Sequence, residues 1–119
     1  MSRQTVAAAR RYYDTVDNAG PEDIVALFDP AAEYRRPGYA PMIGRDALLE
    51  FYGTDRGIVA GSHRITSLIT DYPDRVAVEG RFSGQLRDGR TVDLGFADFF
   101  CFQRGLILTR TTYFETAAV

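Results

Sequence analysis

The order of patterns along the chain predicts an α+β fold, with helices laid on one face of a curved, mostly antiparallel sheet. Apolar residues recur at helical spacing in much of the first half, up to about residue 55, and alternate as in strands from residue 62 onward. Asp88-Gly89 is the strongest local signal, because this dipeptide is typical of a two-residue hairpin turn. A chain of 119 residues is long enough to bury one core, so we expect a single domain spanning residues 1–119.

Three helices are expected before the main run of strands. The first covers about residues 3–18, where the apolar side chains share one face. The second begins at Pro21, which suits the first turn of a helix, and ends at Asp29-Pro30. The third runs over about residues 45–55, and two glycines loosen its end.

Five strands are expected, most of them recognised by the alternation of apolar and polar residues. They cover residues 31–36, 62–71, 75–87, 92–102 and 106–115. Pro37-Gly38 ends the first strand, and a looping segment follows through Pro41. Pro73 lies at the centre of the next turn, and a turn around Arg104 joins the last two strands.

One residue in the strand 92–102 needs a special explanation. Side chains alternate along a strand, so Asp98 shares a face with Phe96, Phe100 and other apolar residues, and it is the only polar residue there. An unpaired buried charge is very costly, so this carboxyl must stay protonated, find a cation or serve a ligand. Asp98 is therefore the first candidate for a functional residue.

The neighbours of Asp98 depend on the register of the two hairpins. If Asp88 and Gly89 are the two loop residues, Glu79 lies opposite Asp98, and Arg81 falls on the same face. If the following turn has three residues, Arg110 lies opposite Asp98 from the other side. A two-residue turn would move Arg110 to the other face of the sheet.

Two interpretations of this inner surface remain open. It is either a buried ion-pair network that holds three strands in register, or the floor of a pocket with acid–base groups. Ser83, Gln85 and Thr112 are also expected to face inward. Strand faces that point into a core are usually apolar, so these polar side chains favour the pocket.

Composition and charge argue against several kinds of partner. With 16 acidic and 14 basic residues and no basic run, the chain gives no case for binding nucleic acid or an anionic membrane. The sequence has no apolar stretch long enough to span a bilayer and no signal-peptide pattern, so a cytoplasmic location is expected. One cysteine and one histidine cannot build a zinc site alone, and we expect no metal.

Four segments give the chain a resemblance to a known family. They are RRYYDTVDNAGPEDIVALF at 10–28, RRPG at 35–38, GRDALLEFY at 44–52 and GFADFFCF at 95–102. With these segments the chain resembles the nuclear transport factor 2-like superfamily, and within it the ketosteroid isomerases and SnoaL-like polyketide cyclases. The resemblance implies a cystatin-like, ketosteroid isomerase-like cone, in which three N-terminal helices pack on the curved sheet.

The resemblance also implies roles for individual residues. Tyr13 matches the family's oxyanion-binding tyrosine, and Asp98 matches its protonated aspartic acid. Tyr12 is adjacent on the same helix, and only one of the two tyrosines can point fully at the sheet. The isomerases carry their catalytic base, an aspartate, immediately before the proline of the first strand, where this chain has Arg36. Steroid isomerisation is therefore expected to be absent or very weak.

A second resemblance is to limonene-epoxide hydrolase, which has the same fold. That enzyme uses two carboxylates and an arginine on neighbouring strands to activate water and protonate an epoxide. Glu79, Arg81 and Asp98 supply a similar set of groups, although the order of acid and arginine along the strand is reversed.

These arguments give two groups of candidate site residues. The predicted catalytic residues are Asp98, Tyr13, Glu79 and Arg81. The predicted substrate-binding residues are Arg36, Arg110, His63, Tyr34, Phe96 and Phe100. His63 is included because histidine titrates near neutrality and could carry a proton.

The function predicted from the sequence is acid–base chemistry without a cofactor on a small lipophilic molecule that carries a carbonyl or an epoxide. The reaction would be isomerisation, aldol-type ring closure or water addition. The alternative is a non-catalytic module for ligand binding or dimerisation. These two functions differ in whether Asp98 is locked in an arginine pair with no space beside it.

A homodimer is expected through the outer face of the sheet. Ala97, Phe99 and Cys101 make the centre of that face apolar, whereas a solvent-exposed face should be polar.

Overall fold

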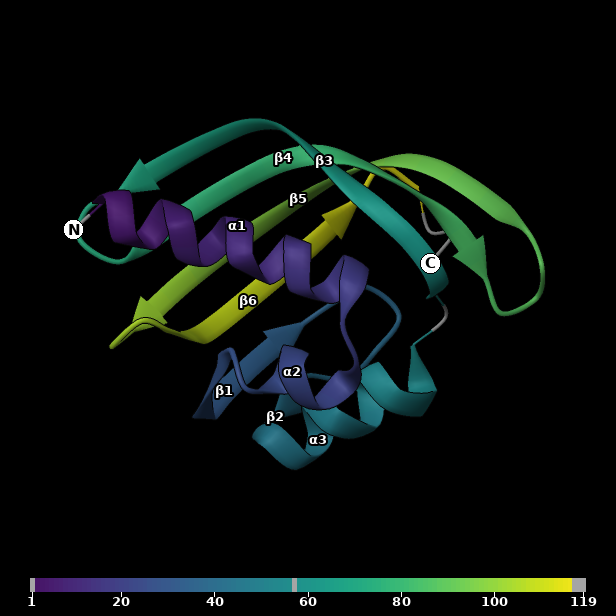
Figure 1. The fold of residues 1–119 in the computed structure, drawn as a ribbon, viewed down its shortest axis with the longest axis horizontal. Helices are drawn as coiled ribbons and strands as arrows, with labels where there is room; N and C mark the ends of the chain where they lie inside the picture. The colour runs from purple at the N-terminus through teal and green to yellow at the C-terminus, as the bar shows by residue number, and fades with distance from the viewer. Residues whose placement is uncertain (1, 57, 117–119) are drawn as a thin grey trace.

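A computed structural model describes residues 2–56 and 58–116 of the chain. Its helices are α1 (Ser2–Asn18), α2 (Pro21–Val25), α3 (Arg45–Glu50) and the π-helix η1 (Phe51–Asp55), which continues α3. Its strands are β1 (Phe28–Arg35), β2 (Met42–Ile43), β3 (Ile58–Asp71), β4 (Arg75–Leu86), β5 (Thr91–Gln103) and β6 (Leu106–Phe114). The predicted α+β fold, with N-terminal helices on a curved sheet, is confirmed (Figure 1).

The strands form one six-stranded mixed sheet in the order β2-β1-β6-β5-β4-β3. β1 and β6 run parallel, while each of the other described neighbours is antiparallel. This pairing brings a strand from the first third of the chain beside the last strand. The inner face of the sheet is therefore built from both ends of the sequence.

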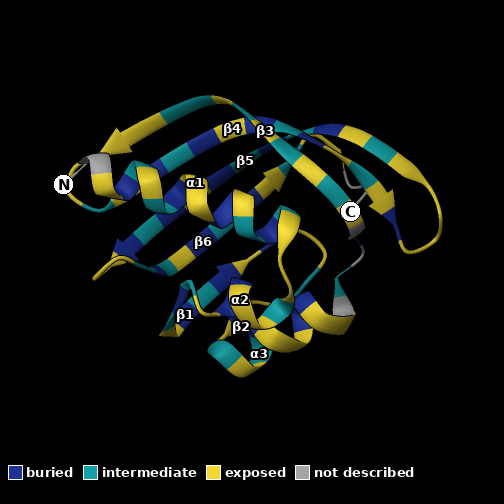
Figure 2. Cartoon of the chain, in the orientation of Figure 1, coloured by how far each residue is buried: buried dark blue, intermediate teal, exposed yellow. Residues whose placement is uncertain are grey.

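Helix α1 lies across the concave face of the sheet (Figure 1). Its apolar residues Ala9, Tyr13 and Val16 recur at helical spacing and are buried. Along β4, β5 and β6, buried positions alternate with more exposed ones (Figure 2). The core lies between α1 and the buried side of these strands.

The first strand differs from its prediction. β1 begins at Phe28 and includes Asp29-Pro30, which was expected to end the second helix; α2 stops at Val25 instead. The register between β1 and β6 shifts between Phe28 and Glu33, and Pro30 lies within this irregular stretch. A proline has no N–H to donate, so a strand tolerates it where the regular ladder is interrupted.

Two other strands also differ from their predictions. β2 follows directly after Pro41 and was not predicted, because its two residues are too few to show an alternating pattern. β3 begins at Ile58 rather than at residue 62.

The turn between β4 and β5 has three residues rather than two. The N–H of Leu86 donates to the carbonyl of Arg90 at 2.8 Å, and the N–H of Gly89 donates to the carbonyl of Leu86 at 3.0 Å. Gly89 has φ +90°, a conformation that suits glycine. Val78 therefore faces Asp98, and Glu79 faces Ala97.

The predicted positions of Glu79 and Arg81 beside Asp98 are therefore wrong. A shift of one residue moves every side chain of a strand to the opposite face. Glu79 is exposed on the outer face, and Arg81 forms ion pairs there with Asp93 at 3.1 Å and Glu115 at 3.6 Å. The expected inward placement of Ser83 and Gln85, both of which are exposed, is wrong for the same reason.

The turn between β5 and β6 has two residues, Arg104-Gly105, both with positive φ. By itself this turn would place Arg110 on the outer face. A bulge shifts the register between Cys101 and Phe102, so that Arg110 lies opposite Phe100 on the inner face. The predicted proximity of Arg110 to Asp98 is confirmed, although Thr112 is the residue directly opposite Asp98.

The outer face of the sheet carries two exposed aromatic side chains. Phe99 is 46% exposed and Tyr113 is 57% exposed, with ring centroids 6.0 Å apart.

None of the described helices is both long enough and apolar enough to cross a membrane.

Candidate functional site

Asp98 is fully buried and held by three donors. The hydroxyl of Tyr13, on α1, donates to Oδ2 at 2.5 Å. Nη2 of Arg110, on β6, donates to the same oxygen at 2.9 Å, and the hydroxyl of Thr112 donates to Oδ1. The carboxylate of Asp98 therefore ties α1 to β5 and β6.

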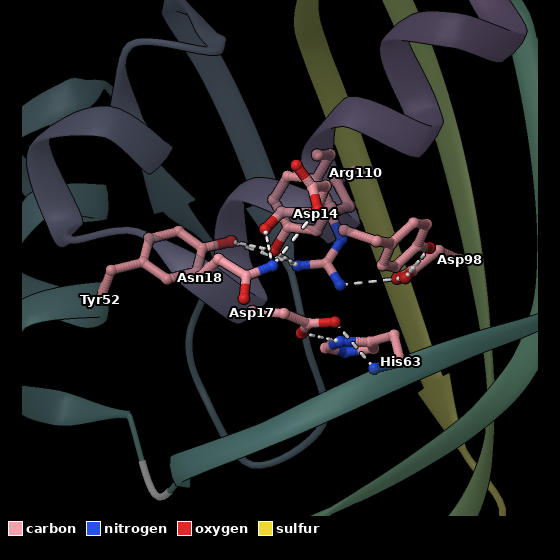
Figure 3. A network of polar contacts seen from close by, with 9 residues as sticks. Asp14, Asp17, Asn18, Tyr52, His63, Asp98 and Arg110 are labelled. Atoms are coloured by element: carbon pink, nitrogen blue, oxygen red, sulfur yellow. Dashed lines mark hydrogen bonds and ion pairs between the residues drawn. The ribbon is translucent and has the colours of Figure 1, made fainter.

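Arg110 joins Asp98 to a pair of tyrosines (Figure 3). Its Nη1 donates to the hydroxyls of Tyr12 at 2.7 Å and Tyr52 at 3.2 Å. These two hydroxyls are 2.6 Å apart, so one donates to the other. The second phenolic proton has no acceptor among the described residues, so it is available to a ligand oxygen.

Only one of the adjacent tyrosines was expected to point fully at the sheet, but both are buried and both rings pack on Phe100 of β5. Tyr12 is 1% exposed and Tyr13 is 3% exposed. Tyr13 packs on Phe96 and Phe100 of the sheet, while Tyr12 also packs on Phe28 of β1. The core continues around α1, so two neighbouring helical positions are both covered.

A second chain of hydrogen bonds leads to Asp98 from β1. Because the hydroxyl of Thr112 donates to Asp98, the hydroxyl of Tyr34, 2.8 Å away, must donate to Thr112. Tyr34 in turn accepts a hydrogen bond from Nη1 of Arg36 at 3.0 Å. Every hydrogen bond in this series therefore points from Arg36, which can only donate, toward the accepting carboxylate of Asp98.

Burial sets the protonation of the cluster. It raises the pKa of Tyr12 and Tyr52, and burial together with the charge of Asp98 raises the pKa of Tyr13 well above the usual phenol value. Burial alone would lower the pKa of Arg110, but Asp98 and the surrounding phenols outweigh it and raise that pKa. The phenols therefore stay neutral and Arg110 stays charged near neutral pH.

A small cavity of about 10 Å³ lies beside this cluster. This volume is roughly that of one water-sized probe. Its polar lining includes Arg36, Arg56, His63, Arg110 and the Tyr12–Tyr52 pair, and its apolar walls include Phe82, Phe96 and Phe114. Among the described residues that line it, Asp98 is absent, so this cavity does not place open space beside Asp98 as the pocket interpretation expected.

His63 and Asp17 form a hydrogen-bonded pair at the cavity wall (Figure 3). Nδ1 of His63 is 2.6 Å from Oδ1 of Asp17, and the backbone N–H of His63 donates to Oδ2 at 2.9 Å. When the carboxylate accepts the Nδ1 proton, the neutral ring keeps its acceptor lone pair on Nε2. The imidazole packs against Tyr13, Phe82 and Phe96, which hold its plane.

Arg36 and Arg56 add positive charge to the cavity. Arg36 is 8% exposed, and Arg56 is half-buried. Burial lowers the pKa of Arg56; Tyr12 and Tyr52 oppose this, while the charges of Arg36 and Arg110 add to it. Three guanidinium groups therefore meet around one small space.

The structure brings together most of the residues predicted from the sequence. Tyr13 and Arg110 both hydrogen-bond Asp98. The other predicted residues on the inner side are Arg36, Tyr34, His63, Phe96 and Phe100. Glu79 and Arg81 lie on the outer face. Among the described residues, no cluster of three or more histidine, cysteine or acidic side chains is arranged to hold a metal.

Sequence reasoning missed several members of the site, namely Asp17, Tyr12, Tyr52 and Arg56. Asp17 carried a usable signal, since it lies one helical turn after Tyr13 and therefore on nearly the same face of α1. The other three carried none, because their positions depend on how α3, η1 and α1 pack together.

Comparison with known families gives one match over most of the chain. The model of the SnoaL-like domain matches residues 9–109. No protein with a curated description matches this chain in sequence.

Solved structures show the same fold at low sequence identity. SalBIII, an epoxide hydrolase/cyclase-like enzyme with a role in pyran ring formation in polyether salinomycin, is 16% identical with a TM-score of 0.85, over 97% of this chain and 93% of that one. An LEH-like epoxide hydrolase of M. tuberculosis is 16% identical with a TM-score of 0.80, over 95% and 84%. A protein with a ketosteroid isomerase-like fold from Catenulispora acidiphila DSM 44928, in complex with trimethylamine, is 18% identical with a TM-score of 0.78, over 89% and 83%.

Proposed function

The chain belongs to the SnoaL-like domain family, and from this premise we propose that it is an acid–base enzyme acting on a small lipophilic carbonyl compound. One observation carries the proposal: a paired histidine, an arginine and a spare phenolic proton line the same cavity. A base and a set of oxyanion donors are the two parts that proton abstraction next to a carbonyl requires.

In this proposal His63 is the base. Its Nε2 takes a proton from the carbon next to the substrate carbonyl. The electrons of the broken C–H bond form the C=C bond of the enolate, and the π electrons of the carbonyl move onto its oxygen. Asp17 holds the ring in the tautomer that accepts at Nε2 and stabilises the imidazolium that forms. Returning the proton to another carbon gives isomerisation, and attack of the enolate carbon on a second carbonyl gives ring closure.

The donors for the enolate oxygen are Arg110 and the Tyr12–Tyr52 pair. Arg110 already bonds both hydroxyls through Nη1, and one phenolic proton remains to donate. Tyr13 is not assigned this role, because its proton is given to Asp98. Asp98 acts as a positioning residue that holds Tyr13 and Arg110.

Water addition to an epoxide is the second candidate reaction. A cavity of about 10 Å³ beside His63 has room for about one water molecule, which the same base would activate. A larger substrate needs a lining side chain to move, and Arg56, which is half-buried, is the cation nearest to solvent. The same small volume also suits a non-catalytic binding module, which is the third possibility.

The test is a screen of cyclic ketones for deuterium exchange at the α-carbon by NMR, with epoxides screened for diol formation. His63→Gln and Asp17→Asn should each lower the rate, and His63→Gln by about 10²–10⁴-fold, because the base is lost. Glu79→Gln, on the outer face, is the matched control and should keep the wild-type rate. If the wild type turns over nothing in the screen, or if His63→Gln remains fully active, the enzyme proposal fails.

A further inference from the structure

Arg36 is a buried cation with an unsatisfied edge. Its Nη1 donates to Tyr34, but Nε and Nη2 are buried and have no hydrogen-bond partner. These two nitrogens lie on one edge of the guanidinium plane, with their N–H bonds nearly parallel. That edge is the fork with which arginine binds two oxygens of one carboxylate.

The missing partner has to be an acceptor. In the described part of the chain, every buried side-chain polar atom without a partner is a guanidinium nitrogen, two of them on Arg36 and one on Arg110. All three atoms can only donate. Buried polar groups are nearly always paired, so these nitrogens call for an acceptor oxygen that the described residues do not supply.

The charges around the cavity point the same way. Arg36, Arg56 and Arg110 line it, and Asp98 forms an ion pair with Arg110 alone. Within the described residues, neither Arg36 nor Arg56 forms an ion pair. These two guanidinium charges therefore have no anion beside them. Burying the charge of Arg36, the more buried of the two, costs free energy unless a ligand supplies the anion.

Arg36 is also held in place for binding. Its guanidinium lies 4.8 Å from the ring centroid of Phe114 and 5.2 Å from that of Phe51, and Tyr34 fixes one nitrogen. Phe51 opens the π-helix η1, a type of distortion that is frequent at functional sites. The arginine is therefore oriented before a ligand arrives, which reduces the entropy lost on binding.

We propose that Arg36 binds the carboxylate of the ligand through its Nε–Nη2 edge. This extends the proposed function by naming the substrate class: a lipophilic carbonyl compound that also bears a carboxylate. A planar carboxylate matches the two-donor edge, whereas a phosphate is tetrahedral and larger. Because the cavity is only about 10 Å³, a lining side chain has to move to admit the ligand. The second cation, Arg56, completes the positive surroundings of the carboxylate from the half-buried side of the cavity.

The experiment measures the change in Tm on adding benzoate, inorganic phosphate or chloride at equal ionic strength. Benzoate should raise the Tm of the wild type by a few degrees, and phosphate and chloride should raise it less. Arg36→Met should need about tenfold more benzoate, or more, for the same rise in Tm, because two charge-assisted hydrogen bonds are lost. Arg35→Met is the matched control, because Arg35 is the exposed neighbour that pairs with Glu33. This variant should keep the benzoate response of the wild type.

Two measurements keep a binding role apart from a structural one. Without ligand, Arg36→Met should keep or raise the Tm, since it removes an unpaired buried charge. Arg36→Lys should keep the charge but bind benzoate more weakly, because lysine lacks the fork. An equal response to all three anions, an unchanged benzoate response in Arg36→Met, or no response in the wild type overturns the proposal.

The benzoate response is also measured in His63→Gln, so that binding and turnover are separated. A response that survives in this inactive variant supports the carboxylate site independently of catalysis. Turnover of neutral ketones by a wild type that does not respond to benzoate leaves the enzyme proposal standing and overturns this one. A benzoate response without any turnover supports the carboxylate site and contradicts the proposed enzymatic function.

Discussion

Asp98 is the residue on which three elements depend. Its two oxygens receive hydrogen bonds from Tyr13, Arg110 and Thr112, and the side chain has no exposed surface. An amide in its place offers one acceptor instead of two and puts an NH₂ group against these donors. Arg110 would then be a buried charge without its counter-charge.

We predict that Asp98→Asn lowers the free energy of unfolding by roughly 3–5 kcal/mol, because it removes the negative partner of a buried ion pair. The measurement is equilibrium unfolding in urea. Asp93→Asn is the control on the same strand, since its ion pair with Arg81 is exposed and worth at most about 1 kcal/mol. An Asp98→Asn variant as stable as Asp93→Asn would argue against the role of Asp98 in holding Arg110.

At the residue scale, the sequence identified Asp98 because a single carboxyl stood in an apolar strand face. It could not identify Asp17 and His63 as a pair, because the two lie 46 positions apart and only the packing of α1 on β3 joins them. Arg36 was predicted to bind substrate, but its free edge is visible only once Tyr34, Phe51 and Phe114 are in place.

At the element scale, the turns decide which residues face the site. The β4–β5 turn places Gly89 at φ +90°, and an added Cβ there would meet nothing within 4 Å. The effect of a substitution at this position therefore comes from the backbone alone.

Gly89→Ala should lower the free energy of unfolding by about 1–2 kcal/mol, because a left-handed conformation is unfavourable for alanine. Gly89→Asn should lower it less, since asparagine visits this region more readily. Urea unfolding of the two variants checks the order. Equal losses would contradict the backbone explanation and point to the side chain instead.

The same turn explains how far the elements could be predicted. The long strands and α1 were found because their periodic patterns are long. The register failed because Asp88-Gly89 suits both a two-residue turn and the end of a three-residue turn, and one extra residue exchanges the two faces of β4. The bulge in β5–β6 had no sequence signal, yet it is the bulge that returns Arg110 to the site.

At the scale of the whole molecule, the outer face of the sheet carries an exposed aromatic pair. Phe99 and Tyr113 are about half exposed and lie against each other. We predict a homodimer through this face, seen as twice the monomer mass by light scattering at micromolar concentration.

Phe99→Asp should convert this dimer to a monomer, because it places a charge at the centre of the interface. Ile43→Asp, at an exposed apolar position on β2, should leave the mass unchanged. A wild type that is monomeric under these conditions would refute the dimer.

The buried tyrosines give the molecule a stability limit on the alkaline side. Burial raises the pKa of Tyr12, Tyr13 and Tyr52 in the folded state, so the unfolded chain loses these protons at a lower pH than the folded one. Their contribution to stability is fully present below the ordinary phenol pKa of about 10 and is lost as pH rises above it.

The urea midpoint of unfolding should therefore fall steeply above about pH 10. Between pH 7 and 9 the three tyrosines should contribute little to its pH dependence. Tyr13→Phe should reduce the steepness of that fall, because one of the titrating groups is gone. A midpoint that stays constant to pH 11 would contradict the raised phenol pKa values.

The parallel pairing of β1 with β6 has a consequence for how the chain is made. Tyr34 and Thr112 are 78 positions apart, and Tyr13 and Asp98 are 85 apart, so two of the hydrogen bonds that join the site span most of the sequence. During synthesis β1 has no neighbour on that side until β6, the last strand, leaves the ribosome. The loops that must close are long, which is typical of slow folding. Until then the nascent chain carries an open strand edge on β1, with Arg35 and Arg36 at the end of that strand, and charged side chains on an exposed edge disfavour pairing with other chains.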